Sequence, residues 1–164
     1  MHSVLVRYHE VALKKGNRSY FVERLKGNLV SAVKGLGLRE SKTLSGRLLL
    51  TFGAERDREE IRRRVQSVFG VANFSFVART PPDLKVLESE ILASLNGKSF
   101  GSFRVDTKRE DKRFPLTSPE INAQIGAAVK ERSGARVDLK NAELTISIEI
   151  GKDGFIIEGF FGPV

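Results

Sequence analysis

Hydrophobic residues recur along the chain with two periods, one typical of strands and one typical of helices. Near the N-terminus Val4, Val6 and Tyr8 occupy alternate positions, which predicts a half-buried strand that residues 10–13 could extend. After a short basic turn the hydrophobic spacing becomes helical. This helix is expected to end at Gly35 and Gly37, and its hydrophobic stripe consists of Phe21, Leu25, Leu29, Val33 and Leu36.

The following patterns complete one small domain. Residues 38–44 form a weak strand candidate and residues 47–52 a strong one. Asp57 is placed to cap a second helix, and Glu60 is placed to complete a capping box. Residues 72–79 form the last strand of this half. The predicted order is β-α-β-β-α-β, which is the ferredoxin-like arrangement.

A proline-rich linker predicts the boundary between two domains. Consecutive prolines in Thr80-Pro81-Pro82-Asp83 forbid continuation of a helix and favour an extended chain. We therefore divide the chain into residues 1–80 and 81–164. The second half has about four strands and two helices, including a hairpin that turns at 151–154. The predicted fold class is α+β, with a ferredoxin-like domain followed by an α/β domain.

Charge and composition narrow the function. The chain of 164 residues has a net charge of +8 and a pI near 10.0, which favours a polyanionic partner, either nucleic acid or an anionic membrane surface. It contains no cysteine, which excludes disulfides, thiolate metal sites and cysteine nucleophiles. It has two histidines, outside any metal-spaced cluster, and no long apolar run or signal-peptide core. We expect a cytoplasmic binding module without a cofactor, a metal or a catalytic constellation of its own.

The stretch of residues 104–120 is the best candidate for binding. Its strand is expected to turn Phe103 and Val105 toward the core. The run Ser118-Pro119-Glu120 then predicts a helix start with Ser118 as N-cap. A basic loop that leads into a helix N-terminus favours anions, whereas the alternative is a solvated surface loop. The cations of this stretch are Arg104, Lys108, Arg109, Lys112 and Arg113.

Other residues extend this candidate RNA-binding site. Phe114 either stacks on an unpaired nucleotide or packs beneath its own loop, and the sequence does not decide between these alternatives. Ser118 and Asn122 offer hydrogen bonds at the helix start.

A second basic cluster in the first half consists of Lys14, Lys15, Asn17 and Arg18, with Asn17 as a candidate helix cap. One cluster in each half predicts a composite surface across both domains. The arginines of residues 62–64 are expected to be solvated helix charges, with RNA contact as the alternative.

Three segments carry a family resemblance. Residues 8–21 (YHEVALKKGNRSYF) resemble the opening of the tRNA 4-thiouridine synthase family, also called tRNA sulfurtransferases. Residues 105–122 (VDTKREDKRFPLTSPEIN) look like the central motif of its THUMP domain, and residues 134–149 (GARVDLKNAELTISIE) are similar to the following THUMP segment. Because the segments occur in the family's order, the resemblance covers essentially the whole chain.

The resemblance implies a ferredoxin-like domain followed by a THUMP domain. In that family the pair binds tRNA, and the THUMP domain engages the single-stranded 3′ end of the acceptor stem. A separate ATP-pyrophosphatase-type domain carries out 4-thiouridine formation, yet this sequence has neither its Ser-Gly-Gly motif nor a cysteine. We therefore expect a non-catalytic tRNA-binding protein that is either a stand-alone protein working with a catalytic protein in trans or a fragment. Members of the family commonly form homodimers, and dimerisation of this chain stays open.

Three alternatives remain. The chain could be an accessory subunit of another tRNA modification enzyme, for acetylation or methylation, since a THUMP motif alone does not separate these. A small ferredoxin-like phosphohydrolase would use Asn17 and Arg18 on an anion, but nothing extends that site. A membrane-surface protein is disfavoured because the basic clusters lie in loops rather than on an amphipathic basic helix.

Overall fold

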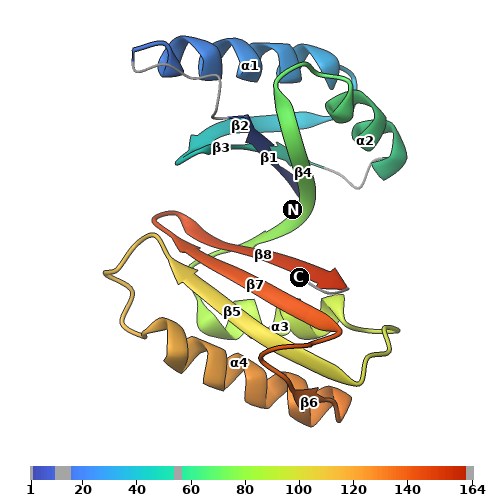
Figure 1. Ribbon diagram of the computed structural model, residues 1–164, viewed down its shortest axis with the longest axis vertical. Helices are drawn as coiled ribbons and strands as arrows, with labels where there is room; N and C mark the ends of the chain where they lie inside the picture. The colour runs from blue at the N-terminus through green and yellow to red at the C-terminus, as the bar shows by residue number, and fades with distance from the viewer. Residues whose placement is uncertain (1, 10–15, 54–56, 162–164) are drawn as a thin grey trace. The chain divides into compact units, whose positions relative to one another are not determined.

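The computed structural model describes residues 2–9, 16–53 and 57–161 (Figure 1). The chain forms two compact units, residues 1–77 and 78–164, and each is described by itself. Within the described residues no helix is both long and apolar enough to cross a membrane.

The first unit has the predicted β-α-β-β-α-β order. Its sheet has the strand order β2-β3-β1-β4, and β3 is antiparallel to both of its neighbours. Both helices of this unit pack against the same face of β1, and the buried side chains of Val4 and Val6 on that face belong to the same core. The elements are β1 (His2–Tyr8), α1 (Arg18–Ala32), β2 (Leu38–Leu44), β3 (Arg47–Phe52), α2 (Arg58–Gln66) and β4 (Val71–Thr80).

Strand β1 is buried on both faces, because Ser3 and Leu5 are buried as well as Val4 and Val6. The prediction that only one face of this strand would be buried was therefore wrong. Leu5 lies opposite Leu49 in the β1–β3 ladder, and both side chains are buried. In the same ladder Ser3 lies opposite Thr51, and their hydroxyls are 3.1 Å apart. This hydrogen bond allows two polar side chains to be buried without the cost of unsatisfied groups.

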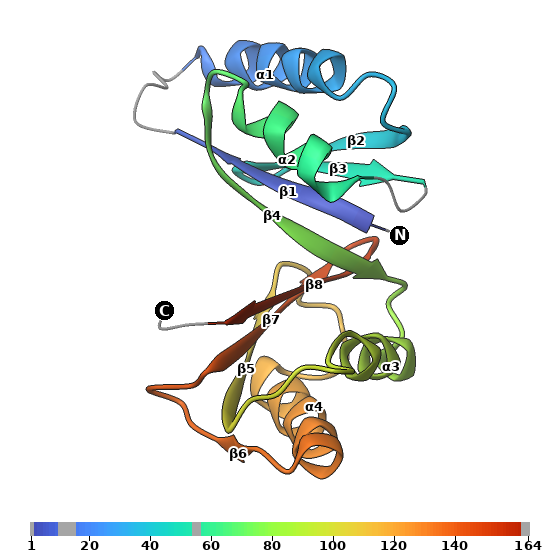
Figure 2. The ribbon, with the colours of Figure 1, turned by 90° about the vertical axis from the view of Figure 1, so that its right-hand side faces the viewer.

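The second unit places two helices on one side of a mixed sheet. From the C-terminal end of β4 the strand order is β4-β8-β7-β5-β6. Strand β5 is parallel to β6 and β7, whereas β8 is antiparallel to β7 and to the end of β4. Figure 2 shows both helices against the same side of this sheet. The elements are α3 (Leu84–Ser94), β5 (Ser102–Arg109), α4 (Ser118–Ser133), β6 (Arg136–Val137), β7 (Leu144–Gly151) and β8 (Gly154–Phe161).

Helix α4 begins one residue earlier than predicted, because its cap is Thr117 and not Ser118. The Thr117 hydroxyl accepts a hydrogen bond from the Glu120 backbone N–H at 3.3 Å, and Pro119 lies at the second helical position. Thr117 and Glu120 have the spacing of a capping box, a signal that the sequence contained and that was missed. At the other end Gly134 has a φ of 72° and caps the helix.

Two glycines of the second unit are expected to respond oppositely to alanine. Gly154 has a φ of 138°, and a Cβ there would lie 2.4 Å from the Thr80 carbonyl oxygen. Gly154→Ala should lower the free energy of unfolding by about 2 kcal/mol or more, because it combines backbone strain with a clash.

A Cβ at Gly126, inside α4, would meet no atom within 4 Å. Gly126→Ala should therefore stabilise by about 0.5–1 kcal/mol through helix propensity. Urea denaturation checks both values, and equal stability of the two variants would contradict the described turn.

Candidate nucleic-acid interface

The basic stretch runs along β5, through a loop and into α4. Phe103 and Val105 are buried beneath the helices, whereas Arg104 is half-buried and Lys108 is exposed on the opposite face of the strand. The alternation predicted for this strand is therefore confirmed. It leaves the charged side chains on the face of the sheet that carries no helix.

Three cations of the stretch are exposed to solvent. Lys108 is paired with Glu110 at 2.9 Å, and its side chain is 75% exposed. Arg113 forms two hydrogen bonds with Asp111, of 2.9 and 3.1 Å, and is 74% exposed. These bonds hold the pKa of the Asp111 carboxyl below its ordinary value. Lys112 is also exposed. The Lys108–Glu110 pair is exposed on both sides and contributes little net free energy, so a phosphate can replace the Glu110 carboxylate.

Arg104 and Arg109 instead hold the protein backbone. Arg109 donates from Nη1 to the carbonyl oxygens of Phe114, at 3.4 Å, and Leu116, at 3.2 Å. Arg104 donates from Nε to the Thr145 hydroxyl at 3.1 Å and from Nη1 to the Leu139 carbonyl at 3.3 Å. Both side chains therefore use their donors to fix neighbouring loops, a role that charge counting did not indicate.

Phe114 packs into its own unit. Its ring meets the buried ring of Phe155 edge to face, with centroids 5.2 Å apart and an interplanar angle of 88°. Of the two alternatives for Phe114, this geometry corresponds to packing beneath its own loop rather than to a ring exposed for stacking on a nucleotide. Its contribution to the surface is to hold the basic loop in place.

An apolar groove lies beside the helix start. It has a volume of about 470 Å³, and small residues of α4 form one wall, where Ala123, Gly126 and Ala127 follow one helical stripe. The Asn122 side chain lines it, and the Oδ1 atom is buried without a hydrogen-bond partner among the described residues. A concave apolar site with a few polar groups is typical of ligand binding. The lining residues are Phe103, Val105, Pro119, Asn122, Ala123, Gly126, Ala127, Lys130, Val137 and Leu139.

The predicted residues of the first unit lie apart along the chain from this groove. Asn17 is at the N-cap position of α1, but its side chain makes no capping hydrogen bond, so the predicted cap was wrong in that respect. Its backbone has a φ of −100° and a ψ of −5°, outside the extended conformation usual for capping. Arg18 is the first residue of the helix and is exposed. Lys14 and Lys15 lie outside the described residues.

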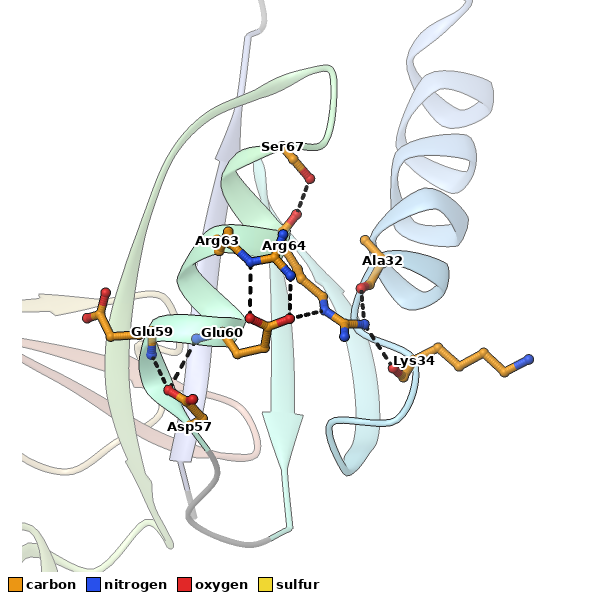
Figure 3. Close-up of polar contacts among 8 residues, drawn as sticks. All are labelled: Ala32, Lys34, Asp57, Glu59, Glu60, Arg63, Arg64 and Ser67. Atoms are coloured by element: carbon orange, nitrogen blue, oxygen red, sulfur yellow. Dashed lines mark hydrogen bonds and ion pairs between the residues drawn. The ribbon is translucent and has the colours of Figure 1, made fainter.

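Helix α2 contains a second group of arginines, of which two bind one carboxylate (Figure 3). Glu60 accepts hydrogen bonds from Nε of Arg63 at 3.0 Å and from Nε of Arg64 at 2.8 Å. Arg64 also donates to the carbonyl oxygen of Ala32, the last residue of α1, at 3.3 Å, and to that of Lys34, just beyond the helix, at 3.2 Å. This arrangement ties the two helices of the first unit together.

The cap of α2 is Asp57, as predicted, but Glu60 does not complete a capping box. Asp57 accepts hydrogen bonds from the backbone N–H groups of Glu59, at 3.0 Å, and Glu60, at 3.3 Å. The Glu60 carboxylate instead turns to two guanidinium groups, because hydrogen bonds between opposite charges are stronger than one to a neutral backbone donor. Hydrogen bonds from Arg63 and then Arg64 lower the pKa of Glu60 to about 2.

Within the described residues no group of three or more histidine, aspartate or glutamate side chains is arranged to hold a metal ion. The second unit presents exposed cations in its basic loop and an apolar groove beside the start of α4, an arrangement suited to binding an anion together with an apolar group.

Comparison with known families agrees with this organisation. Residues 3–75 match the model of the ThiI ferredoxin-like domain, and residues 78–157 match the model of the THUMP domain. The chain therefore contains a ThiI ferredoxin-like domain followed by a THUMP domain. This confirms the predicted family and fold class, with the ferredoxin-like domain preceding the THUMP domain.

The relatives of these two domains are longer proteins. The chain is 42% identical over 151 residues to a protein of Thermus thermophilus named "Probable tRNA sulfurtransferase", a match that covers 92% of this chain and 37% of the relative. A protein of the same name from Moorella thermoacetica is 39% identical over 156 residues, covering 94% of this chain and 40% of the relative. The chain thus spans about two fifths of the length of these relatives.

A solved structure shares the fold of both domains. It is described as a 4-thiouridine synthetase–RNA complex with bound ATP, and it superimposes with a TM-score of 0.82 at 24% identity. The superposition covers 98% of this chain and 41% of that protein.

The Glu60 carboxylate, which is bound by Arg63 and Arg64, predicts a specific pH dependence of the stability of the ferredoxin-like domain. The pKa of Glu60 is lowered in the folded state from an ordinary value of 4.5 to about 2. Its stabilising contribution is therefore full above the ordinary value and is lost as the pH falls through about 2. The difference in unfolding free energy between wild type and Glu60→Gln should be constant near neutral pH and should shrink in this acid range.

Urea denaturation at a series of pH values measures this difference. Glu59→Gln is the matched control, because it removes the same charge from the neighbouring residue, whose pairing with Arg62 is an exposed contact of 3.5 Å. A difference for Glu60→Gln that does not change with pH would contradict the assignment.

Proposed function

We propose that this chain is a tRNA-binding module of a tRNA thiolation system in the cytoplasm. It would recognise the 3′ end of the acceptor stem and present the tRNA for 4-thiouridine formation. We assign the chemistry to an ATP-pyrophosphatase-type protein that acts in trans, and no catalytic step to this chain. The relatives named tRNA sulfurtransferase support the tRNA-thiolation part of the proposal, because each matches more than nine tenths of this chain.

The observation that carries the proposal is the exposed basic loop beside an apolar groove in the THUMP domain. Lys108, Lys112 and Arg113 would contact phosphates, with release of counterions as the source of affinity. Arg104 and Arg109 would act indirectly by keeping the loops in place. A strand of RNA would then pass from this loop toward the N-terminal end of α4.

The groove would accept an unpaired nucleotide. A base inserted between α4 and the side chains of Val137 and Leu139 would bury its faces against apolar atoms. Asn122 would hydrogen-bond the edge of the base, satisfying the buried Oδ1 or, after rotation of the amide, placing its NH₂ group there. Lys130, also in the lining, would pair with a phosphate. A base that is stacked within a duplex could not enter, which would favour a single-stranded end.

Neutralising the exposed lysines should weaken binding and its salt dependence. Lys112→Gln and Lys108→Gln should each reduce the slope of log affinity against log salt by about 0.7–0.9, the value for one phosphate contact. Fluorescence anisotropy with a labelled acceptor-stem minihelix at several salt concentrations measures this slope. Lys85→Gln, at an exposed position on α3, is the control and should leave the slope unchanged. Equal slopes for all three variants would contradict phosphate contact by Lys108 and Lys112.

Filling the groove should abolish recognition of the 3′ end. Wild type should bind a minihelix with a single-stranded 3′ end about tenfold more tightly than a blunt one, as expected if one base is stacked. Gly126→Leu should remove this preference and leave the affinity for the blunt minihelix unchanged. Gly27→Leu in α1 is the control, since a Cβ at either glycine meets no atom within 4 Å. Equal affinity of wild type for the two minihelices would refute 3′-end recognition.

A further inference from the structure

Two arginines of α2 stack on an aromatic ring of β4. The guanidinium carbon of Arg58 lies 4.8 Å from the centroid of Phe76, and that of Arg62 lies 5.3 Å from it. Arg58 and Arg62 are four residues apart on a helix, so they are neighbours on its surface. Both side chains are exposed, whereas Phe76 is half-buried. We call Arg58 and Arg62 the stacked pair.

The ring that supports the stacked pair is itself fixed. Phe76 packs against the core of the ferredoxin-like domain together with Phe74, and the two rings meet edge to face with centroids 6.4 Å apart. A guanidinium that stacks on a ring is held through its flat face. Its N–H groups point outward in the plane of the guanidinium and remain able to bind an anion in a forked geometry.

The other two arginines of α2 are held in the opposite way. Arg63 and Arg64 direct their N–H groups to Glu60, and Arg64 also directs them to two backbone carbonyls (Figure 3). Their donors are therefore engaged within the protein. The four arginines of this helix thus divide into two that lie over the Phe76 ring, Arg58 and Arg62, and two that hydrogen-bond to Glu60, Arg63 and Arg64.

We propose that the stacked pair, Arg58 and Arg62, is a binding site for backbone phosphates of RNA in the ferredoxin-like domain. The inference rests on the proposed function, because it deepens tRNA binding by adding contacts outside the THUMP domain. Stacking reduces the side-chain freedom that an arginine loses on binding, which favours phosphate contact at these positions over a flexible surface arginine.

One acidic side chain lies within this surface. Glu59 is paired with Arg62 at 3.5 Å, and the Glu59 side chain is 82% exposed. A phosphate would compete with this carboxylate for Arg62. Removing the carboxylate in Glu59→Gln should therefore tighten RNA binding, a gain that a purely structural role of the stacked pair would not produce.

The experiment compares charge-matched variants of adjacent residues. Arg58→Gln, Arg62→Gln and Arg63→Gln each remove one positive charge from the same helix. Binding of a labelled acceptor-stem minihelix is measured by anisotropy across salt concentrations, after thermal melting has established that each variant is folded. Arg58→Gln and Arg62→Gln should each lower the salt slope by about 0.7–0.9, and the double variant should bind about tenfold more weakly. Arg63→Gln should retain the wild-type slope.

Phe76→Leu tests whether the ring matters. It keeps an apolar side chain in the core but removes the stacking surface, so affinity should fall severalfold while the number of charges is unchanged.

Each outcome separates the two proposals. If wild type binds no RNA, the proposed function fails, and the inference fails with it. If wild type binds RNA but Arg58→Gln and Arg62→Gln lose no more affinity than Arg63→Gln, the stacked pair is not a phosphate site, and the proposed function stands. Binding of wild type to phosphatidylserine vesicles that the double variant abolishes, with RNA affinity retained, would assign the pair to a membrane surface and would also overturn the inference.

Discussion

The basic loop of the THUMP domain depends on one half-buried guanidinium group, that of Arg109. Arg109 donates to the carbonyl oxygens of Phe114 and Leu116, which lie in the loop that follows its own strand. Together with the packing of Phe114 on Phe155, these bonds set the course of the chain between β5 and α4. The exposed positions of Lys112 and Arg113 follow from that course. A cation that looks like part of the binding surface in the sequence is thus the group that positions the surface.

The order of helices and strands could be predicted because each depends on local pattern. Strands β2 and β3 have the predicted bounds, Leu38–Leu44 and Arg47–Phe52. The predictions that were wrong concern the hydrogen-bond partner of a polar side chain. Glu60 had the right spacing for a capping box, but two arginines that follow it offered stronger hydrogen bonds. Such competition depends on side-chain geometry that spacing alone does not give.

The groove could not be predicted for a different reason. Its walls come from α4 and from the segment around Val137 and Leu139, which meet only because β6 pairs in parallel with β5 at Phe103 and Val137. The small residues Ala123, Gly126 and Ala127 follow one helical stripe, and that stripe was the available signal. In the sequence alone, such a stripe of small residues is typical of a helix face that packs closely on a neighbouring element. The structure instead leaves this face lining an open groove, next to the buried Oδ1 of Asn122.

Counting cations gives an upper limit on the charges available to RNA, and the structure supplies a rule for reducing it. An arginine held by its edge, such as Arg64 on α2 or Arg109 at the end of β5, has committed N–H groups to carbonyl or carboxylate oxygens. An arginine that lies over an aromatic ring, such as Arg58 on Phe76, is restrained by a contact that does not require its N–H groups. Phosphate recognition needs both immobility and unused donors. By this rule the charge that matters on α2 comes from Arg58, and from Arg62 once a phosphate displaces the exposed Glu59 carboxylate, although all four arginines of the helix contribute equally to the net charge of +8.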